Sequence, residues 1–277
     1  MDVRYVADNI RYQRMDTKEL RDSYLVQNLF ENNIITLLYV DIDRAIIGSA
    51  VPVKGDLKLE ATKKQMAADY FTERREVGVI NVGNKGSITV DGKKFELENR
   101  DVLYIGKESR EILFSSEDSE EPAYFYIQSY PAHQVHPTQL IPFGQARKVD
   151  LGSKEEANER TIYQYIHLEG AKSCQLVMGF TQLAEGSIWN TMPAHTHMRR
   201  SEIYMYFGID ENNAVFHFMG EPDKTKHLVM RNRQAVISPS WSIHAGAGTK
   251  NYAFVWGMGG ENQEFTDMDG VPLSEIL

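Results

Sequence analysis

Apolar and β-branched residues occur in short runs along most of the chain, and this pattern predicts many strands and few helices. Turn-forming Gly, Asn and Asp residues separate several of the runs, as expected for antiparallel strands. The predicted strands cover residues 34–40, 45–51, 76–82, 87–90, 102–105, 123–127, 174–183, 202–207, 214–219, 235–237 and 252–256. The expected fold class is therefore mainly all-β, a barrel or sandwich with few short helices.

Two local signals are sharper than the rest. Asp91-Gly92 separates the apolar run that ends at Val90 from the run that begins at Lys93. This dipeptide supplies the two positive-φ positions of a type I′ turn and predicts a tight hairpin. Asp16, with Glu19 three residues later, matches a capping box and predicts a helix that begins at the next residue.

A weak internal repeat suggests that one β-unit occurs twice. Residues 74–83 resemble residues 199–208, and residues 101–105 resemble residues 235–239. Matched patterns at a fixed order along a chain indicate repeated structural units. The sequence therefore predicts two barrels in tandem.

The expected domain organisation follows from this repeat. Residues 1–45 are expected to form an N-terminal arm with a short helix, and residues 46–140 a degenerate barrel without metal ligands. Residues 141–277 are expected to form a metal-binding barrel. The stretch 130–150 contains three prolines and is interpreted as the linker.

Composition narrows the class of protein. Of the 277 residues, 42% are apolar and 25% are charged, which is typical of a soluble globular chain. The formal net charge of −9 argues against nucleic acid as a partner. Cys174 is the single cysteine, so no intrachain disulfide can form. No signal peptide or membrane-spanning run is visible, and we expect a cytoplasmic protein without a membrane partner.

The most informative chemistry is a cluster of histidines with one glutamate. His195 and His197 are two residues apart, a spacing that points both side chains to one face of a strand. Glu202 follows in an H-x-H-x₄-E pattern, and His244 comes later in the chain. Three imidazoles and a carboxylate suit Zn, Fe, Mn, Ni or Co, and this is the ligand pattern of a cupin barrel. The alternative is ordinary strand histidines with surface or core partners.

Glu202 should face away from His197 on a continuous strand, so residues 198–201 are expected to turn or bulge. Tyr204 and Tyr206 then share the inward face with Glu202 and could donate protons or orient substrate oxygens. They could equally be core residues with hydrogen-bonded hydroxyls. His217 lies in an apolar run, either as a buried structural histidine or as an acid or base.

Three further residues are candidates for substrate binding. Arg199 and Arg200 lie beside the ligands and could bind a substrate carboxylate in bidentate fashion, or could form a solvated turn. Trp241 precedes His244 and could form a wall of the pocket against a sugar face, or could serve packing alone.

Residues 190–200 (NTMPAHTHMRR) and 234–244 (QAVISPSWSIH) resemble the 5-keto-4-deoxyuronate isomerase family. The similarity extends through residues 73–81, 256–258 and 260–263 and covers essentially the whole chain. The resemblance implies a bicupin, two cupin-like jelly rolls in tandem. It also implies one zinc ion per subunit, held by His195, His197, Glu202 and His244, in a cytoplasmic homohexamer.

The resemblance further implies an aldose–ketose isomerase, an intramolecular oxidoreductase of pectin and polyuronate breakdown. Its anionic keto-sugar substrate would be 5-keto-4-deoxyuronate, and its product 3-deoxy-D-glycero-2,5-hexodiulosonate. Tyr204, Tyr206, His217 and a metal-bound water are candidates for the base, and a hydride shift would need none. An iron-dependent cupin dioxygenase and a non-catalytic sugar-binding cupin are the alternative functions.

Overall fold

A computed structural model describes all 277 residues of the chain, which form two compact units. The first unit comprises Met1–Arg4, Asn28–Ala146 and Tyr165–Val177. The second comprises the remaining segments, Tyr5–Gln27, Arg147–Gln164 and Met178–Leu277. The boundaries expected from the sequence treat each unit as one continuous stretch, whereas each unit is assembled from three segments.

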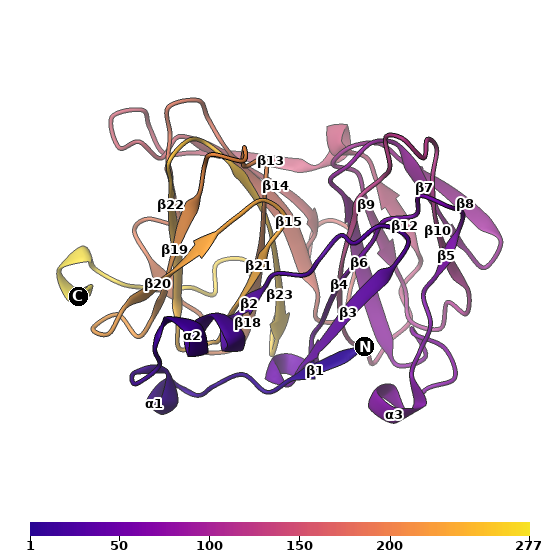
Figure 1. Cartoon of the computed structure of the whole chain (residues 1–277), viewed down its shortest axis with the longest axis horizontal. Coiled ribbons are helices and arrows are strands. Elements are labelled where there is room, and N and C mark those ends of the chain that lie inside the picture. The colour runs from indigo at the N-terminus through magenta and orange to yellow at the C-terminus, as the bar shows by residue number, and fades with distance from the viewer. The chain divides into compact units, whose positions relative to one another are not determined.

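The first unit contains a seven-stranded and a four-stranded sheet (Figure 1). The larger sheet has the order β1 (Asp2–Arg4), β3 (Ile35–Val40), β4 (Ile46–Ala50), β11 (Phe125–Pro131), β6 (Arg75–Asn81), β9 (Val102–Ile105), β12 (Gln139–Ile141). The smaller has the order β5 (Leu57–Lys58), β10 (Ile112–Ser116), β7 (Gly86–Val90), β8 (Lys93–Leu97). The unit also contains α3 (Lys63–Met66) and the 3₁₀ turns Ile42–Arg44 and Phe143–Gln145.

The second unit repeats this arrangement. Its seven-stranded sheet has the order β13 (Arg147–Leu151), β14 (Arg160–Ile166), β15 (Val177–Leu183), β23 (Ala253–Gly260), β18 (Arg200–Phe207), β21 (Ala235–Ser238), β2 (Leu25–Val26). Its four-stranded sheet has the order β16 (Trp189–Asn190), β22 (Ile243–Gly248), β19 (Val215–Gly220), β20 (Lys226–Met230). A small ladder pairs β17 (His195–Thr196) with β24 (Asp269–Gly270), and a 3₁₀ turn covers Leu273–Glu275.

The helices α1 (Asn9–Tyr12) and α2 (Thr17–Tyr24) belong to the second unit, where α2 contacts β20 and β21 (Figure 1). Asp16 caps α2 and forms the expected capping box with Glu19. The ring of Tyr12 is fully buried, and its hydroxyl donates to the carbonyl of Met219 at 2.7 Å. Residues from the N-terminus thus complete the packing of the second unit.

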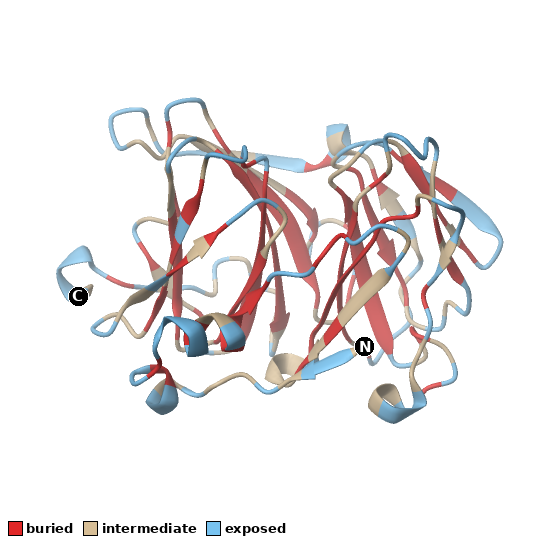
Figure 2. Ribbon diagram, viewed as in Figure 1, coloured by how far each residue is buried: buried red, intermediate tan, exposed pale blue.

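The two units share one topology, which confirms the expected tandem of mainly β units. In the first, β6 lies between β11 and β9, and in the second β18 lies between β23 and β21. Alternate residues of the central strands face the core between the two sheets of a unit, as Val77, Val79 and Phe125 do in the first. The central strands are buried along most of their length, and exposure is concentrated in the turns (Figure 2).

Local predictions met mixed outcomes. The hairpin at Asp91-Gly92 is confirmed, with φ of 48° and 80° at the two turn residues. The stretch 130–150 is not a simple linker, because it contains β12 and most of β13. The strand β22, which carries His244, was not expected at all, because its sequence Ile-His-Ala-Gly-Ala-Gly has few β-formers.

Candidate metal centre and adjoining cavity

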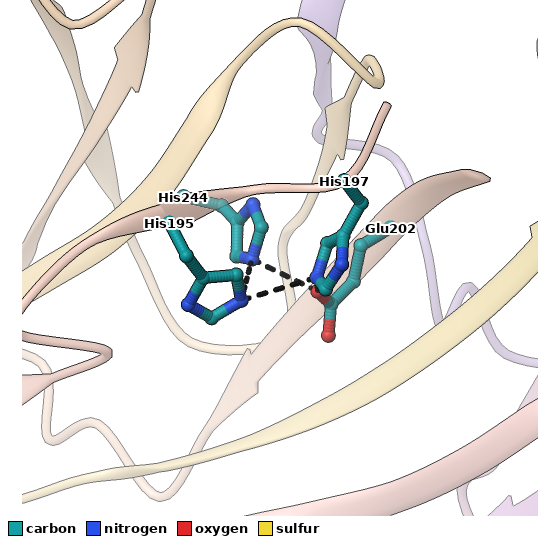
Figure 3. Close-up of side chains that lie close together, drawn as sticks. All are labelled: His195, His197, Glu202 and His244. Atoms are coloured by element: carbon teal, nitrogen blue, oxygen red, sulfur yellow. Dashed lines mark hydrogen bonds and ion pairs between the residues drawn. The ribbon is translucent and has the colours of Figure 1, made fainter. Parts of the chain in front are cut away.

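Four side chains from three separate elements converge in the second unit (Figure 3). His195 and His197 lie on and just after β17, Glu202 lies on β18, and His244 lies on β22. The expected turn is present at residues 198–199, and it reverses the chain so that Glu202 faces His197. Pairing of β19 with both β20 and β22 fixes the strand of His244 from the opposite sheet.

The spacing of the four ligand atoms fits a metal ion. His195 Nε2 lies 3.1 Å from His197 Nε2 and 3.0 Å from His244 Nε2. Glu202 Oε2 lies 3.1 Å from His197 Nε2 and 3.0 Å from His244 Nε2. Bonds of about 2.0–2.1 Å to one tetrahedral ion place its ligands roughly 3.3 Å apart. All four atoms lie within 4.8 Å of one another, so one ion could contact them all.

The hydrogen-bond geometry of His197 supports the same conclusion. Its Nδ1 lies 2.6 Å from the backbone carbonyl of Asp267, which can only accept a hydrogen bond. In a neutral imidazole the single N–H is then on Nδ1, so Nε2 has a lone pair that faces the carboxylate of Glu202. Two acceptors that face each other repel unless a cation lies between them. The residues present thus fit a divalent cation, and the carbonyl of Asp267 fixes the orientation of one ligand.

Burial and mutual proximity also set the charge of the cluster. Burial, together with the neighbouring His244, lowers the pKa of His195 to about 2, so this imidazole is neutral and able to bind a metal. Burial alone would raise the pKa of Glu202, but His244 and His197 hold it well below the usual range. A neutral imidazole at His195 and an ionised carboxylate at Glu202 are the protonation states that metal binding requires.

A cavity of about 250 Å³ opens beside the cluster. His195, His197 and Glu202 contribute to its wall. The remaining lining residues are mostly apolar, with a few polar groups: Leu151, Arg160, Ile162, Thr181, Thr191, Pro193, Tyr204, Phe254, Trp256, Met258, Phe265 and Met268. A mostly apolar cavity with few convergent polar groups is typical of a small-molecule site.

Tyr204 is the only one of the three proposed acid–base residues that lines this cavity. Its hydroxyl lies 3.1 Å from Thr191 Oγ1, which accepts a hydrogen bond from Asn190 Nδ2 at 2.9 Å. Burial, and then the charge of Glu202, raises the pKa of Tyr204 well above its ordinary value. Its hydroxyl therefore stays protonated and available as a donor.

Tyr206 and His217 lie deeper in the same unit. The Tyr206 hydroxyl and His217 Nδ1 are 2.7 Å apart, and neither residue lines the cavity. Nε2 of His217 is buried without a hydrogen-bond partner. The structure therefore brings these two residues to each other rather than to the cavity.

The proposed substrate-binding residues have other contacts. Arg199 binds the carboxylates of Asp267 and Asp269, the latter at 3.0 Å. Arg200 is fully buried and donates to the carbonyl of Asp267 at 3.2 Å. Trp241 packs edge-on against Tyr12 at 5.2 Å between ring centroids. None of the three proposed residues lines the cavity.

Arg160 and Thr191 line the cavity but were not singled out from the sequence. Arg160 begins β14, where the alternation Arg160, Thr161, Ile162 places residues 160 and 162 on one face. This alternation was the available signal, but residues 150–170 were not expected to form strands.

The first unit lacks such a cluster. In the internal repeat, Asp69, Phe71 and Arg110 occupy the positions that correspond to His195, His197 and His244. Asp69 is exposed beside Lys63, Phe71 is buried in the core, and Arg110 lies over the ring of Tyr70. The structure groups metal-ligating side chains at His195, His197, Glu202 and His244 alone. No group of three or more such side chains converges in the first unit.

Among the helices of the chain, none has the length and apolar character needed to span a membrane.

Comparison with protein families matches residues 27–271 to the KduI/IolB family. Two curated relatives, both called 4-deoxy-L-threo-5-hexosulose-uronate ketol-isomerase, come from Lachnoclostridium phytofermentans and Caldicellulosiruptor bescii. They are 53% and 50% identical over 276 residues, which is 100% of each chain.

Solved structures at low sequence identity show the same fold. An IolB-like protein from Salmonella typhimurium LT2 matches with a TM-score of 0.69 and 14% identity, over 87% of this chain and 94% of that one. Oxalate decarboxylase from Bacillus subtilis, a protein with Mn(II) centres, matches with a TM-score of 0.55 and 8% identity. That match covers 80% of this chain and 70% of the decarboxylase. These likenesses concern the cupin-type architecture alone.

Proposed function

The chain belongs to the KduI/IolB family, and from this premise we infer that it is an isomerase of uronate degradation. The reaction is the conversion of 4-deoxy-L-threo-5-hexosulose uronate to 3-deoxy-D-glycero-2,5-hexodiulosonate. The observation that carries this conclusion is identity of about half of all residues, over the entire chain, with ketol-isomerases that act on this substrate. The substrate is a small sugar acid, which the cavity beside His195 and Glu202 is suited to admit.

We further propose that the reaction depends on a divalent metal held by His195, His197, Glu202 and His244. The 3.0–3.1 Å spacing of the ligand atoms supports this. The bound metal would supply Lewis-acid polarisation of the substrate carbonyl and the neighbouring hydroxyl. Zinc is the proposed ion, on the resemblance of residues 190–200 and 234–244 to the isomerase family, while Fe, Mn, Ni and Co also match the donor set.

The chain's own residues would perform three tasks around the reacting carbons. Tyr204, kept protonated by burial, would donate a hydrogen bond to a substrate oxygen as negative charge develops there. Thr191 would orient that hydroxyl, because Asn190 already donates to Thr191 and leaves the threonine hydrogen for Tyr204. The side chains of Phe254 and Trp256 would exclude water, which strengthens both interactions.

Tyr206 and His217 remain candidates for an indirect effect on the reaction. Their mutual hydrogen bond lies in the same buried region, and Tyr206 contacts Tyr204 with ring centroids 6.1 Å apart. They would influence the reaction through Tyr204. Removal of either should therefore change the rate less than removal of Tyr204.

The assay that tests the function is an NMR time course with freshly prepared keto-uronate, run without oxygen. Formation of the 2,5-diketo product, abolished by a chelator and restored by zinc, is the expected result. Conversion that requires iron and oxygen would instead favour the dioxygenase. Binding of the uronate without any conversion would favour the sugar-binding cupin.

A homohexamer in the cytoplasm completes the proposal, on the family resemblance of the chain. Light scattering coupled to gel filtration measures the assembly directly. A mass near that of a single 31.7 kDa chain would contradict the hexamer.

A further inference from the structure

The cavity beside the metal cluster contains a single arginine and no lysine. Arg160 is the first residue of β14, and its backbone pairs with Leu151 of β13, another lining residue. Ile162 lies two residues further along the same face of the strand. Position in the sheet, rather than a mobile loop, therefore directs this guanidinium toward the cavity.

Arg160 has no carboxylate partner. Its side chain donates to the backbone carbonyl of Asn158 at 2.8 Å, and it takes part in no ion pair. A guanidinium carries five N–H donors, so most of this donor capacity is unused. A half-buried cation without a counter-ion has lost hydration and gained little in return. An anion that enters the cavity would offset that loss.

The other arginines near the cluster do not line the cavity. Arg199 is held by two carboxylates, and Arg200 is enclosed at 1% exposure, with its Nη2 on the carbonyl of Asp267 and its Nε and Nη1 buried without a partner. The remaining wall around Arg160 consists largely of apolar side chains such as Phe254, Trp256 and Phe265. A carboxylate placed against that wall would be unpaired and costly to bury.

These observations lead to one assignment, which rests on the proposed function: we propose that Arg160 binds the carboxylate of the uronate substrate. A planar fork of donors matches a carboxylate in bidentate geometry, and the low dielectric of the cavity strengthens the pair. The acid end of the substrate then lies at Arg160, which leaves the opposite, reacting end to face His195, His197 and Glu202. Arg160 would therefore select acidic sugars over neutral ones and set the direction in which the chain of the substrate enters.

The test compares Arg160→Gln with Arg160→Lys, on the keto-uronate and on its methyl ester, which has the same carbon skeleton without the charge. Loss of one partner from a desolvated charge pair predicts an increase of about 30-fold or more in KM for the acid. The KM for the ester should hardly change, and kcat should fall less than kcat/KM. Lysine should restore part of the affinity, because it keeps the charge without the fork.

Arg231→Gln is the matched control, because Arg231 also donates to a backbone carbonyl, that of Asn213 at 2.9 Å, and lies outside the cavity. A second readout needs no turnover: with the metal removed by chelator, binding of acid and ester is followed by tryptophan emission, since Trp256 lines the cavity. The wild type should bind the acid more tightly than the ester, and Arg160→Gln should abolish the difference.

The outcomes separate the two hypotheses. If the wild type isomerises the uronate, and Arg160→Gln has the same KM and affinity for acid and ester as the wild type, the role of Arg160 is refuted and the function stands. If the wild type does not isomerise the uronate, the function fails, and the binding comparison still decides whether Arg160 recognises the carboxylate. An equal loss for acid and ester would also overturn the assignment, because it would indicate damage to the cavity as a whole.

Discussion

His244 shows how much depends on single residues in this site. It is buried at 1% exposure, and its Nε2 lies 3.0 Å from both His195 Nε2 and Glu202 Oε2. No other element of the second unit supplies a fourth ligand atom at this point. The loss of this imidazole leaves three ligands from neighbouring segments and an open side toward β22.

We expect His244→Ala to lose bound metal and isomerase activity together while the chain remains folded. The physical reason is that the ligand count falls below that of the intact site, whereas the apolar core of the unit is untouched. Metal content after gel filtration, with circular dichroism on the same sample, measures both effects. His227→Ala is the control, because His227 is exposed on β20 and outside the cluster. Full activity in His244→Ala would exclude the proposed ligand set.

His217 gives a separate prediction about pH. Burial, reinforced by His244, lowers the pKa of His217 to about 3 from an ordinary value of 6.5. Between these values the unfolded chain binds a proton that the folded chain does not, so folding is stabilised above pH 6.5 and loses that stability as pH falls toward 3. The contribution changes by about 1.4 kcal/mol per pH unit within this window.

Accordingly, His217→Gln should show a shallower loss of unfolding free energy than the wild type between pH 6.5 and about pH 5. Glutamine retains an acceptor for Tyr206 but does not titrate. Urea unfolding of the metal-free proteins at several pH values measures the slope, and His227→Gln serves as the exposed control. Parallel curves for wild type and His217→Gln would contradict the assignment of this pH dependence to His217.

At the scale of elements, the segment 261–271 links the cavity to the metal cluster. Its residues Phe265 and Met268 line the cavity, while its Asp267 accepts from His197 Nδ1 through the backbone carbonyl. The Asp267 side chain binds Arg199 and Asn262, and β24 pairs with β17 beside His195. One short segment therefore forms part of the cavity wall and also orients the His197 side chain.

Asp267→Ala should loosen this segment and weaken metal retention by about 10- to 100-fold, without unfolding the protein. The side chain is lost, so the carbonyl that orients His197 is no longer held in place by Arg199. Competition with a chelator of known affinity measures the change. Asp210→Ala is the matched control, since it removes an exposed ion pair, with Lys250 at 2.8 Å, that belongs to neither the cluster nor the cavity. Unchanged metal affinity in Asp267→Ala would show that the carbonyl is positioned by other contacts.

The sequence predicted those elements whose side chains carry a strong local signal. The hairpin at Asp91-Gly92, the capping box at Asp16 and the turn before Glu202 depend on neighbours in the chain, and the structure contains all three. The sequence predicted the four candidate metal ligands from the H-x-H-x₄-E spacing and from the ligand pattern of cupin barrels. Their convergence is present, while the metal itself stays a prediction.

Long-range partners could not be predicted in the same way. Nothing near Arg199 in the sequence indicates that Asp267 and Asp269 will neutralise it, and nothing near Trp241 indicates that Tyr12 will pack against it. β12 was missed because Pro137 and Pro142 flank it, and β13 because three of its five residues are charged. β14 was missed although its sequence is rich in β-forming residues. Arg160 was therefore overlooked, since its place at the cavity depends on the strand and not on any motif.

At the scale of the whole molecule, the two units share a topology but differ in their candidate metal ligands. Each combines a seven-stranded sheet with a four-stranded sheet, and the cluster that could hold a metal lies in the second unit. A metal ion that binds only the folded state would stabilise it by about 2.7 kcal/mol when its concentration is a hundred times its Kd. This stabilisation should be confined to the second unit, which contains the metal-binding side chains.

Hydrogen exchange with and without a chelator checks this expectation. Removal of the metal should accelerate exchange in β17, β18 and β22 of the second unit, and leave β6 and β11 of the first unit unchanged. The first unit is thus an internal control within the same sample. Equal acceleration in both units would mean that the metal stabilises the chain globally, which the position of its ligands does not predict.

The metal-free core of the first unit bears on how the protein matures. Phe71 and Val77 pack with other apolar side chains there, and the strands around them follow the same order as those around the histidines. An architecture that closes over such a core has no need of an ion to direct its assembly, in contrast to small zinc domains that are unfolded without metal. Folding and the proposed metal loading are therefore expected to be separable steps. If the proposed metal is required for activity, a cell short of it would accumulate a folded, inactive protein that gains activity when supply returns.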